Sequence, residues 1–358
     1  MKKIFLPLAL VAVTILGLSS CKKNDSPAIP GNNDQASARM MQAFFEKHAP
    51  KTETFSFDAT TGGTITLKSG TKITFPANAF VKPDGSPIAG PVTVSAKDIL
   101  KASDMILANK PTVTASGEML ESFGEIIVNA SRNDTALRLN QAVMQRPPTV
   151  MVPVGTATGA KREAPMWAGD TTVSYTNNGY NHENQPTSVT VQYSLSKGID
   201  WSQIPGWGAV NGGTTTFPLD ALGQWRNCDA LYNDPNPKTT VLGYFGNRFN
   251  GQTGSGGQTP SMLFFKKAGT NTLINYSVMI LNPAPGKEGF LSYQNSMPIG
   301  TSGTFLAMSA KDGKFYAELK DVTFGAPAAG KDFISYSFSL TEVSETQLLN
   351  LINQVNTK

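Results

Sequence analysis

After position 53, much of this 358-residue chain alternates between apolar and polar side chains. Clear examples are the runs 54–58 (TFSFD), 64–67 (TITL) and 71–75 (TKITF), which are separated by Gly62-Gly63 and Ser69-Gly70. A period of two is typical of strands that bury one face, and glycines of this kind mark the turns. Because short strands follow one another without a helical period between them, the sequence predicts an all-β fold made of β-sandwiches.

The strand pattern divides into two regions with a less regular middle. We predict a first β-sandwich over 51–155. The stretch 249–260 (FNGQTGSGGQTP) is low in complexity and typical of a linker or long loop. The alternation restarts after it, and we expect a second sandwich, immunoglobulin-like or transthyretin-like, over 261–343. The β-rich middle region and linker, 156–260, can belong to either sandwich.

Two helices are expected at the ends of the β pattern, a short one over 36–50 and a C-terminal one over 344–358. Pro50 ends the first helix. The apolar face of this helix either packs on the β domain, which we favour, or binds a partner. In the second, Ser344 is a typical N-cap. The segment 99–107 is expected to be a short crossing connection between strands. The apolar helical positions are Met40, Met41, Phe44 and Phe45 in the first helix, and Leu348, Leu349, Leu351, Ile352 and Val355 in the second.

The N-terminus carries an export signal. A basic head, Met1-Lys2-Lys3, precedes the apolar run 4–17, whose 14 residues fall short of the ~20 that span a bilayer as a helix. The following Leu18-Ser19-Ser20-Cys21 resembles the lipobox of bacterial lipoproteins. That resemblance implies a signal peptide over 1–20, cleavage before Cys21, a diacylglyceryl thioether on its sulfur and a fatty acid such as palmitate on its amine.

A lipid on Cys21 would attach the protein to the membrane without a spanning helix, because two or more acyl chains give durable binding. The stretch 21–35 lacks an apolar period and is typical of a flexible tether. We therefore expect a lipid anchor in the outer membrane. Lys22-Lys23-Asn24-Asp25 follows the cysteine and leaves both the periplasmic face and the cell surface open.

A family resemblance is carried by 62–67 (GGTITL), 70–80 (GTKITFPANAF) and 90–94 (GPVTV). This pattern is similar to the ZU5 domain, a β-sandwich that acts as a protein-interaction and scaffolding module. Some ZU5 domains cleave themselves after a His-Phe pair that precedes serine. The comparable stretch here, 121–124 (ESFG), has no histidine, so self-cleavage is not implied.

A broader resemblance is carried by 73–80 (ITFPANAF), 103–107 (SDMIL) and 225–229 (WRNCD). These stretches look like a set of uncharacterised Gram-negative outer-membrane lipoproteins. The resemblance spans most of the chain and implies the same membrane location. It carries no activity with it.

Charge and motif content argue against several functions. The formal net charge of +4 includes Lys2 and Lys3, so the mature protein carries 4 − 2 = +2, and no basic cluster of the nucleic-acid-binding type is present. His48 and His182 lie 134 residues apart, which argues against a histidine metal site or a catalytic triad. Cys228 is expected to be a buried small apolar residue. We expect no enzyme, cofactor or nucleic-acid partner, although paired carboxylates for glycoside hydrolysis stay open.

Aromatic residues in the middle region are the best candidates for ligand contacts. Trp201, Trp207 and Tyr180 could stack against sugar rings in exposed loops, or the tryptophans could fill a core, which we favour. The sequence thus predicts a lipid-anchored envelope or cell-surface protein that acts as a non-catalytic interaction or scaffold module. The alternative is a glycan-binding surface lipoprotein for polysaccharide capture. Its partners would be the membrane through Cys21, and envelope proteins or glycans.

Overall fold

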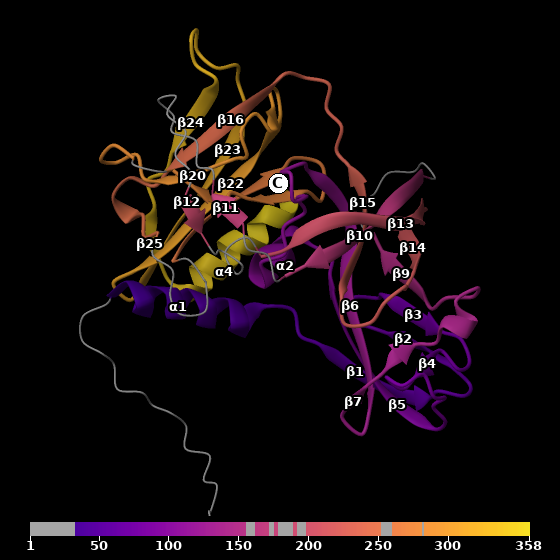
Figure 1. Ribbon diagram of the computed structural model, residues 1–358. Coiled ribbons are helices and arrows are strands. Elements are labelled where there is room, and N and C mark those ends of the chain that lie inside the picture. The colour runs from indigo at the N-terminus through magenta and orange to yellow at the C-terminus, as the bar shows by residue number, and fades with distance from the viewer. Residues whose placement is uncertain are drawn as a thin grey trace, which may run out of the picture. The chain divides into compact units, whose positions relative to one another are not determined.

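The protein is mostly β, with a helix near each end of the part that the structure describes (Figure 1). This computed structural model describes residues 33–154, 162–171, 175–177, 189–191, 198–251, 260–280 and 283–358. Its helices are α1 (Asn33–His48), α2 (Ala102–Ala108) and α4 (Glu345–Gln354), and its 3₁₀ turns are Gln141–Val143, Gly246–Arg248 and Val355–Thr357.

The largest element is an antiparallel sheet in which ten strands lie side by side and form a nearly closed, barrel-like sheet. A short eleventh strand, β7 (Thr135–Ala136), pairs with β6 off this path. In spatial order the ten strands are β1 (Glu53–Asp58), β5 (Pro91–Ile99), β6 (Leu120–Arg132), β15 (Trp225–Leu231), β10 (Arg162–Asp170), β13 (Asp200–Asn211), β14 (Thr214–Pro218), β9 (Thr149–Pro153), β3 (Lys72–Phe75) and β2 (Gly63–Thr66).

Consecutive strands β1 and β2 form the two ends of this sheet. A tight turn joins them, in which the Asp58 carboxylate accepts hydrogen bonds from the backbone N–H and the hydroxyl of Thr60, at 2.8 and 2.6 Å. The Phe57 ring lies over Gly63, where an added Cβ would sit 3.1 Å from the ring carbon Cγ. A glycine at this position therefore leaves room for the Phe57 side chain, near the end of β1, over the first residue of β2.

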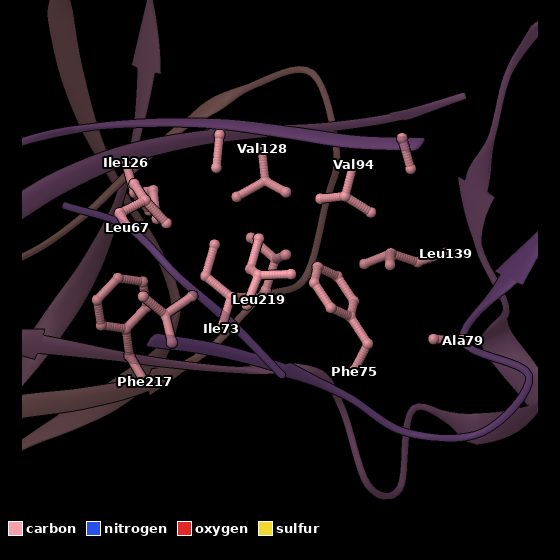
Figure 2. Close-up of a cluster of buried hydrophobic side chains, with 14 of the residues drawn as sticks. Leu67, Ile73, Phe75, Ala79, Val94, Ile126, Val128, Leu139, Phe217 and Leu219 are labelled. Atoms are coloured by element: carbon pink, nitrogen blue, oxygen red, sulfur yellow. The ribbon is translucent and has the colours of Figure 1, made fainter. Parts of the chain in front are cut away.

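The inside of the main sheet is a dry core of alternating side chains. Strand β3 contributes Ile73 and Phe75, β9 contributes Val150 and Val152, and the intervening residues of both strands point outward. Figure 2 shows side chains from several strands converging in this core. Burial of these apolar faces is the main force that holds the sheet in its curved form.

Two five-stranded sheets make up most of the remainder, and a second core lies between them. This core is rich in aromatic rings, and Phe305 contacts Phe265, Phe324 and Tyr276 within it. The first sheet has the order β18 (Leu273–Asn275), β17 (Ser261–Lys267), β22 (Ser302–Lys311), β23 (Lys314–Thr323) and β25 (Thr341–Val343). The second has β19 (Val278–Met279), β20 (Gly289–Leu291), β16 (Lys238–Tyr244) and β21 (Met297–Pro298), with β24 (Phe333–Ser337) parallel to β16.

Two small pairs complete the strands. β4 (Phe80–Val81) pairs with β8 (Arg138–Leu139), and β11 (Tyr175–Asn177) pairs with β12 (Val189–Val191). Both pairs are antiparallel.

The three helices share a third core with the outer face of the main sheet and with the sheet that contains β17 and β22. We call this region the seam. From α1 it receives Met41, Phe44 and Phe45, so the apolar face of this helix packs on its own β structure. Between α1 and α4, the side chains of His48 and Lys47 both contact Glu345, each at 2.7 Å.

Both terminal helices predicted from the sequence are confirmed, as α1 and α4. Ser344 caps α4 through a capping box, in which its hydroxyl accepts from the Gln347 N–H and its own N–H donates to the Gln347 side chain. The expectation that no helix interrupts the strands is wrong at α2. That helix buries Ala102, Met105 and Ile106. It has seven residues and ends before Asn109, whose backbone is in the left-handed conformation. A helix of this length is too short to show a clear helical period in the sequence.

The middle region is divided between the two parts of the fold. Its strands β10, β13, β14 and β15 lie in the main sheet, where β14 pairs with β9 from the 51–155 region. Its strand β16 belongs to the C-terminal sheets. One continuous sheet therefore contains strands from 51–155 and from 156–260, because ladder hydrogen bonds join strands that are distant in sequence.

Candidate functional site

Two of the residues singled out in the sequence, Cys21 and Tyr180, lie outside the residues that the structure describes. The same holds for His182. Their predicted roles therefore stay predictions.

Trp201 is a core residue in this fold. Its side chain is 1% exposed in the seam, and its indole Nε1 donates a hydrogen bond of 2.9 Å to the backbone oxygen of Pro111. Opposite it on β10 lies Gly169, where an added Cβ would stand 2.3 Å from Ile199 and 2.9 Å from the Trp201 ring. The ring thus fills space that the glycine leaves open, and no ligand can reach it in this arrangement.

Trp207 has the opposite environment, because its side chain is 58% exposed. The two tryptophans lie on the same side of the sheet. They pair with Gly169 and Pro165, which are four positions apart on β10, while the two neighbours of Pro165, Ala164 and Met166, point into the inner core. Trp201 lies where the seam covers the outer face, and Trp207 lies where it does not. The other two of the four tryptophans, Trp167 and Trp225, are buried in the seam.

The exposed surface beside Trp207 carries little charge. It is the outer face of β13, β14, β9, β3 and β2, and we call it the Trp207 face. Register places six threonines on it, two of which, Thr64 and Thr74, approach to 3.0 Å between hydroxyl oxygens. Its members are Ala209, Asn211, Thr214, Thr216, Pro218, Thr149, Met151, Pro153, Lys72, Thr74, Thr64 and Thr66. Lys72 is charged, and the exposed Glu163 of β10 borders this face opposite Ala209.

A second feature is a cleft of about 570 Å³. Six segments line it: the turn between β2 and β3, the junction of β5 and α2, the beginning of β6, the end of β9, the end of β17 with the turn that follows it, and the last three residues of the chain. The sequence analysis missed this cleft, because no one segment contains enough of its polar side chains to form a motif.

Two fully buried carboxyl groups lie in β6 and β15. Burial raises the pKa of Glu125 well above its usual range, the nearby Asp229 raises it further, and Lys110 acts in the opposite direction. Neither carboxyl oxygen of Glu125 has a hydrogen-bond partner among the described residues. The signal for such a group was a glutamate directly before the apolar run 126–128 (IIV) of β6.

The Asp229 carboxylate, unlike that of Glu125, accepts hydrogen bonds from other described residues. Its carboxylate accepts hydrogen bonds from the Phe123 N–H, at 3.1 Å, and from the side-chain amide of Asn227. Burial raises its pKa, and these hydrogen bonds act in the opposite direction. Nearby, Lys110 donates to the backbone oxygens of Asn109 and Gly198, both at 3.3 Å, and burial lowers its pKa to about 8.

Nucleophilic and metal chemistry find little support in the described part of the chain. Cys228 is buried in the inner core, and burial raises the pKa of its thiol to about 12, so the reactive thiolate is scarce at neutral pH. No three His, Cys, Asp or Glu side chains of the described residues gather as metal ligands would.

None of the helices among the described residues is both long and apolar enough to cross a membrane. No protein-family model, curated protein or solved structure matches this chain.

Proposed function

We propose that this protein is a lipid-anchored envelope protein that acts as a non-catalytic interaction module. The observation that carries the interaction is the Trp207 face, where a tryptophan is 58% exposed on the outer side of the sheet, directly after an irregularity in the pairing of β13 with β10. Large aromatic side chains dominate binding energy at protein surfaces, and a flat exposed one is a typical anchor for a partner. The anchor rests on Cys21 and its lipobox, and it holds the module at the outer membrane, on its periplasmic face or on the cell surface.

The finer interpretation of the fold belongs to the same proposal. It comprises a ZU5-like region over 51–155 and an immunoglobulin- or transthyretin-like region over 261–343. The ZU5 family supplies scaffolding modules, which agrees with an interaction role, and the β-strands over both regions are consistent with it.

Glycan binding is the second candidate function, and the composition of the Trp207 face favours it. An indole ring offers an apolar plane to the C–H groups of a sugar, and the threonine hydroxyls on the same face can donate to and accept from sugar hydroxyls. Lys72 on this face and Glu163 at its border carry opposite charges, so a neutral polysaccharide fits the described residues better than a charged one. Trp201 takes no part in this version of the proposal, because it is buried.

A glycan array with the mature protein tests this function. We expect binding to neutral glycans, and we expect Trp207→Ala to weaken it by at least about tenfold, which corresponds to the ~1.4 kcal/mol or more that an aromatic anchor contributes. Leu231→Ala is the matched control, because Leu231 is the other large exposed apolar side chain among the described residues, at 44%.

Iodide quenching supplies a direct readout at the same residue. Of the four tryptophans only Trp207 is well exposed, so iodide should quench mainly its emission, and a bound glycan should protect it. Absence of binding to every glycan would reject the glycan version. Binding that persists in Trp207→Ala would reject the Trp207 face.

A further inference from the structure

Two polar side chains face each other inside the seam. Glu125 on β6 lies directly opposite Asn227 on β15, and Asn227 in turn lies opposite Trp167 on β10, whose ring packs in the seam. Directly opposite residues of an antiparallel pair share one side of the sheet, with Cβ atoms about 4.5–5.5 Å apart. Glu125 and Asn227 are both fully buried, so solvent does not reach either side chain.

The oxygens of this pair lack a donor. Among the described residues, no group donates a hydrogen bond to either carboxyl oxygen of Glu125 or to the Oδ1 of Asn227. The Nδ2 of Asn227 is already used, because it donates to the Asp229 carboxylate. An ionised Glu125 would therefore present a carboxylate to a carbonyl oxygen, whereas buried polar groups are normally hydrogen-bonded. A protonated carboxyl has an O–H donor, which is the group that this pair needs.

Asp229 is the member of the cluster that ionises first. Its carboxylate accepts from the Phe123 N–H, at 3.1 Å, as well as from the Asn227 amide. Burial raises the pKa of both carboxyl groups, but only for Asp229 do hydrogen bonds act in the opposite direction. The Asn227 amide thus lies between two carboxyl groups, and it offers its N–H to Asp229 and its oxygen to Glu125.

The other charged groups around the cluster are two lysines and a glutamate. Lys110 acts on Glu125, Lys97 acts on Lys110, and Glu121 acts on Asp229. The Lys110 Nζ donates to two backbone oxygens, both at 3.3 Å, and the ion pairs of the described residues include none between it and Glu125. The helices and the sheet of β17 and β22 contribute mainly apolar side chains to the seam, so Lys110 is a distant counter-charge in an apolar setting.

We propose that Glu125, Asn227 and Asp229 form a proton-dependent lock of the seam, in which a protonated Glu125 donates to the Oδ1 of Asn227 while the amide donates to an ionised Asp229. Loss of the Glu125 proton removes the donor and places a second negative charge in the same buried cluster. A buried charge without a paired donor is unfavourable, so the seam opens locally and water reaches the carboxylate. The lock is independent of the lipid anchor and of the Trp207 face.

The direction of the switch follows from the charges. Below the folded-state pKa of Glu125 the proton is held and the seam is closed, and above that pKa the seam opens. Lys110 weakens the lock while it is charged, because an ammonium group favours the ionised form of Glu125. Burial lowers the pKa of Lys110 to about 8, so this compensation is lost at higher pH.

Acrylamide quenching of tryptophan emission measures the opening in the full mature lipoprotein in neutral detergent. Trp207→Phe supplies the background, because the three other tryptophans of the chain lie in the seam and the exposed one is removed. We expect weak quenching at pH 5 and an increase of at least about threefold by pH 9, with an unchanged far-ultraviolet circular dichroism spectrum, because the opening is local.

Three variants in the same background make the test decisive. Glu125→Gln keeps the size of the side chain and has an amide N–H that is not lost on titration, so quenching should stay weak at every pH. Lys110→Met should move the rise in quenching to higher pH, because a charge that favours the ionised carboxyl is removed. Glu163→Gln changes an exposed carboxyl on β10 and should leave the curve unchanged. Flat quenching in the background protein, an equal rise in Glu125→Gln, or loss of the circular dichroism signal together with the rise would each overturn the lock.

Discussion

Replacement of Trp201 by alanine should lower the free energy of unfolding by about 3–5 kcal/mol. The indole is among the largest fully buried side chains of the described residues, and it packs in the seam against the glycine on β10 that accommodates it. Removal leaves a cavity there and also leaves the Pro111 oxygen without the Nε1 donor that it has now. Urea denaturation followed by far-ultraviolet circular dichroism measures this loss without relying on tryptophan emission.

Trp207→Ala is the matched variant for this measurement. It removes the same side chain from the same strand, but from an exposed position, and should change the free energy of unfolding by no more than about 0.5 kcal/mol. If both variants lose the same free energy, the assignment of one tryptophan to the seam and the other to a binding surface is wrong.

Glu125 should make the protein less stable as the pH rises. Burial and the nearby Asp229 raise its pKa in the folded protein above the unfolded-state value of about 4.3. At a pH between these two pKa values, the folded protein keeps a proton on Glu125 that the unfolded chain has released. Stability from this group is therefore fully present below about pH 4.3 and is lost as the pH rises towards the folded pKa. Glu125→Gln removes the titration and should reduce the slope by up to about 1.4 kcal/mol per pH unit.

Urea midpoints at several pH values between 4.5 and 7.5 test this expectation. The difference in unfolding free energy between Glu125→Gln and the unchanged protein should grow in favour of the variant as the pH rises. Glu163→Gln is the control, since Glu163 is exposed on β10 of the same sheet. Parallel pH curves for the unchanged protein and Glu125→Gln would show that the Glu125 carboxyl does not keep its proton in the fold.

Local patterns in the sequence predict local elements well here. The spacing of Met40, Met41, Phe44 and Phe45 is enough for α1, and Ser344 with Gln347 is enough to begin α4. Alternation along 71–75 likewise identifies the inward Ile73 and Phe75 of β3. Each of these signals lies within one turn of helix or one strand, where side-chain direction follows directly from the backbone period.

Long-range features escape such patterns. Trp201 and Trp207 share a strand and a side of the sheet, and only the coverage by the seam separates their environments. The order of strands in the main sheet joins β14 to β9 and β15 to β6 over long stretches of chain, which alternation alone does not specify. The cleft is lined by six segments that are distant in sequence, so no local pattern reveals it.

The central claim, a lipid-anchored module at the outer membrane, is tested most directly at Cys21. Cells fed an alkyne analogue of palmitate should label the protein, and the membrane fraction should contain it. Cys21→Ala should abolish the label and the retention in membranes, because both depend on acylation of this residue. Cys228→Ala, which changes the other cysteine of the chain, should keep both. Full membrane retention and labelling of Cys21→Ala would contradict the account.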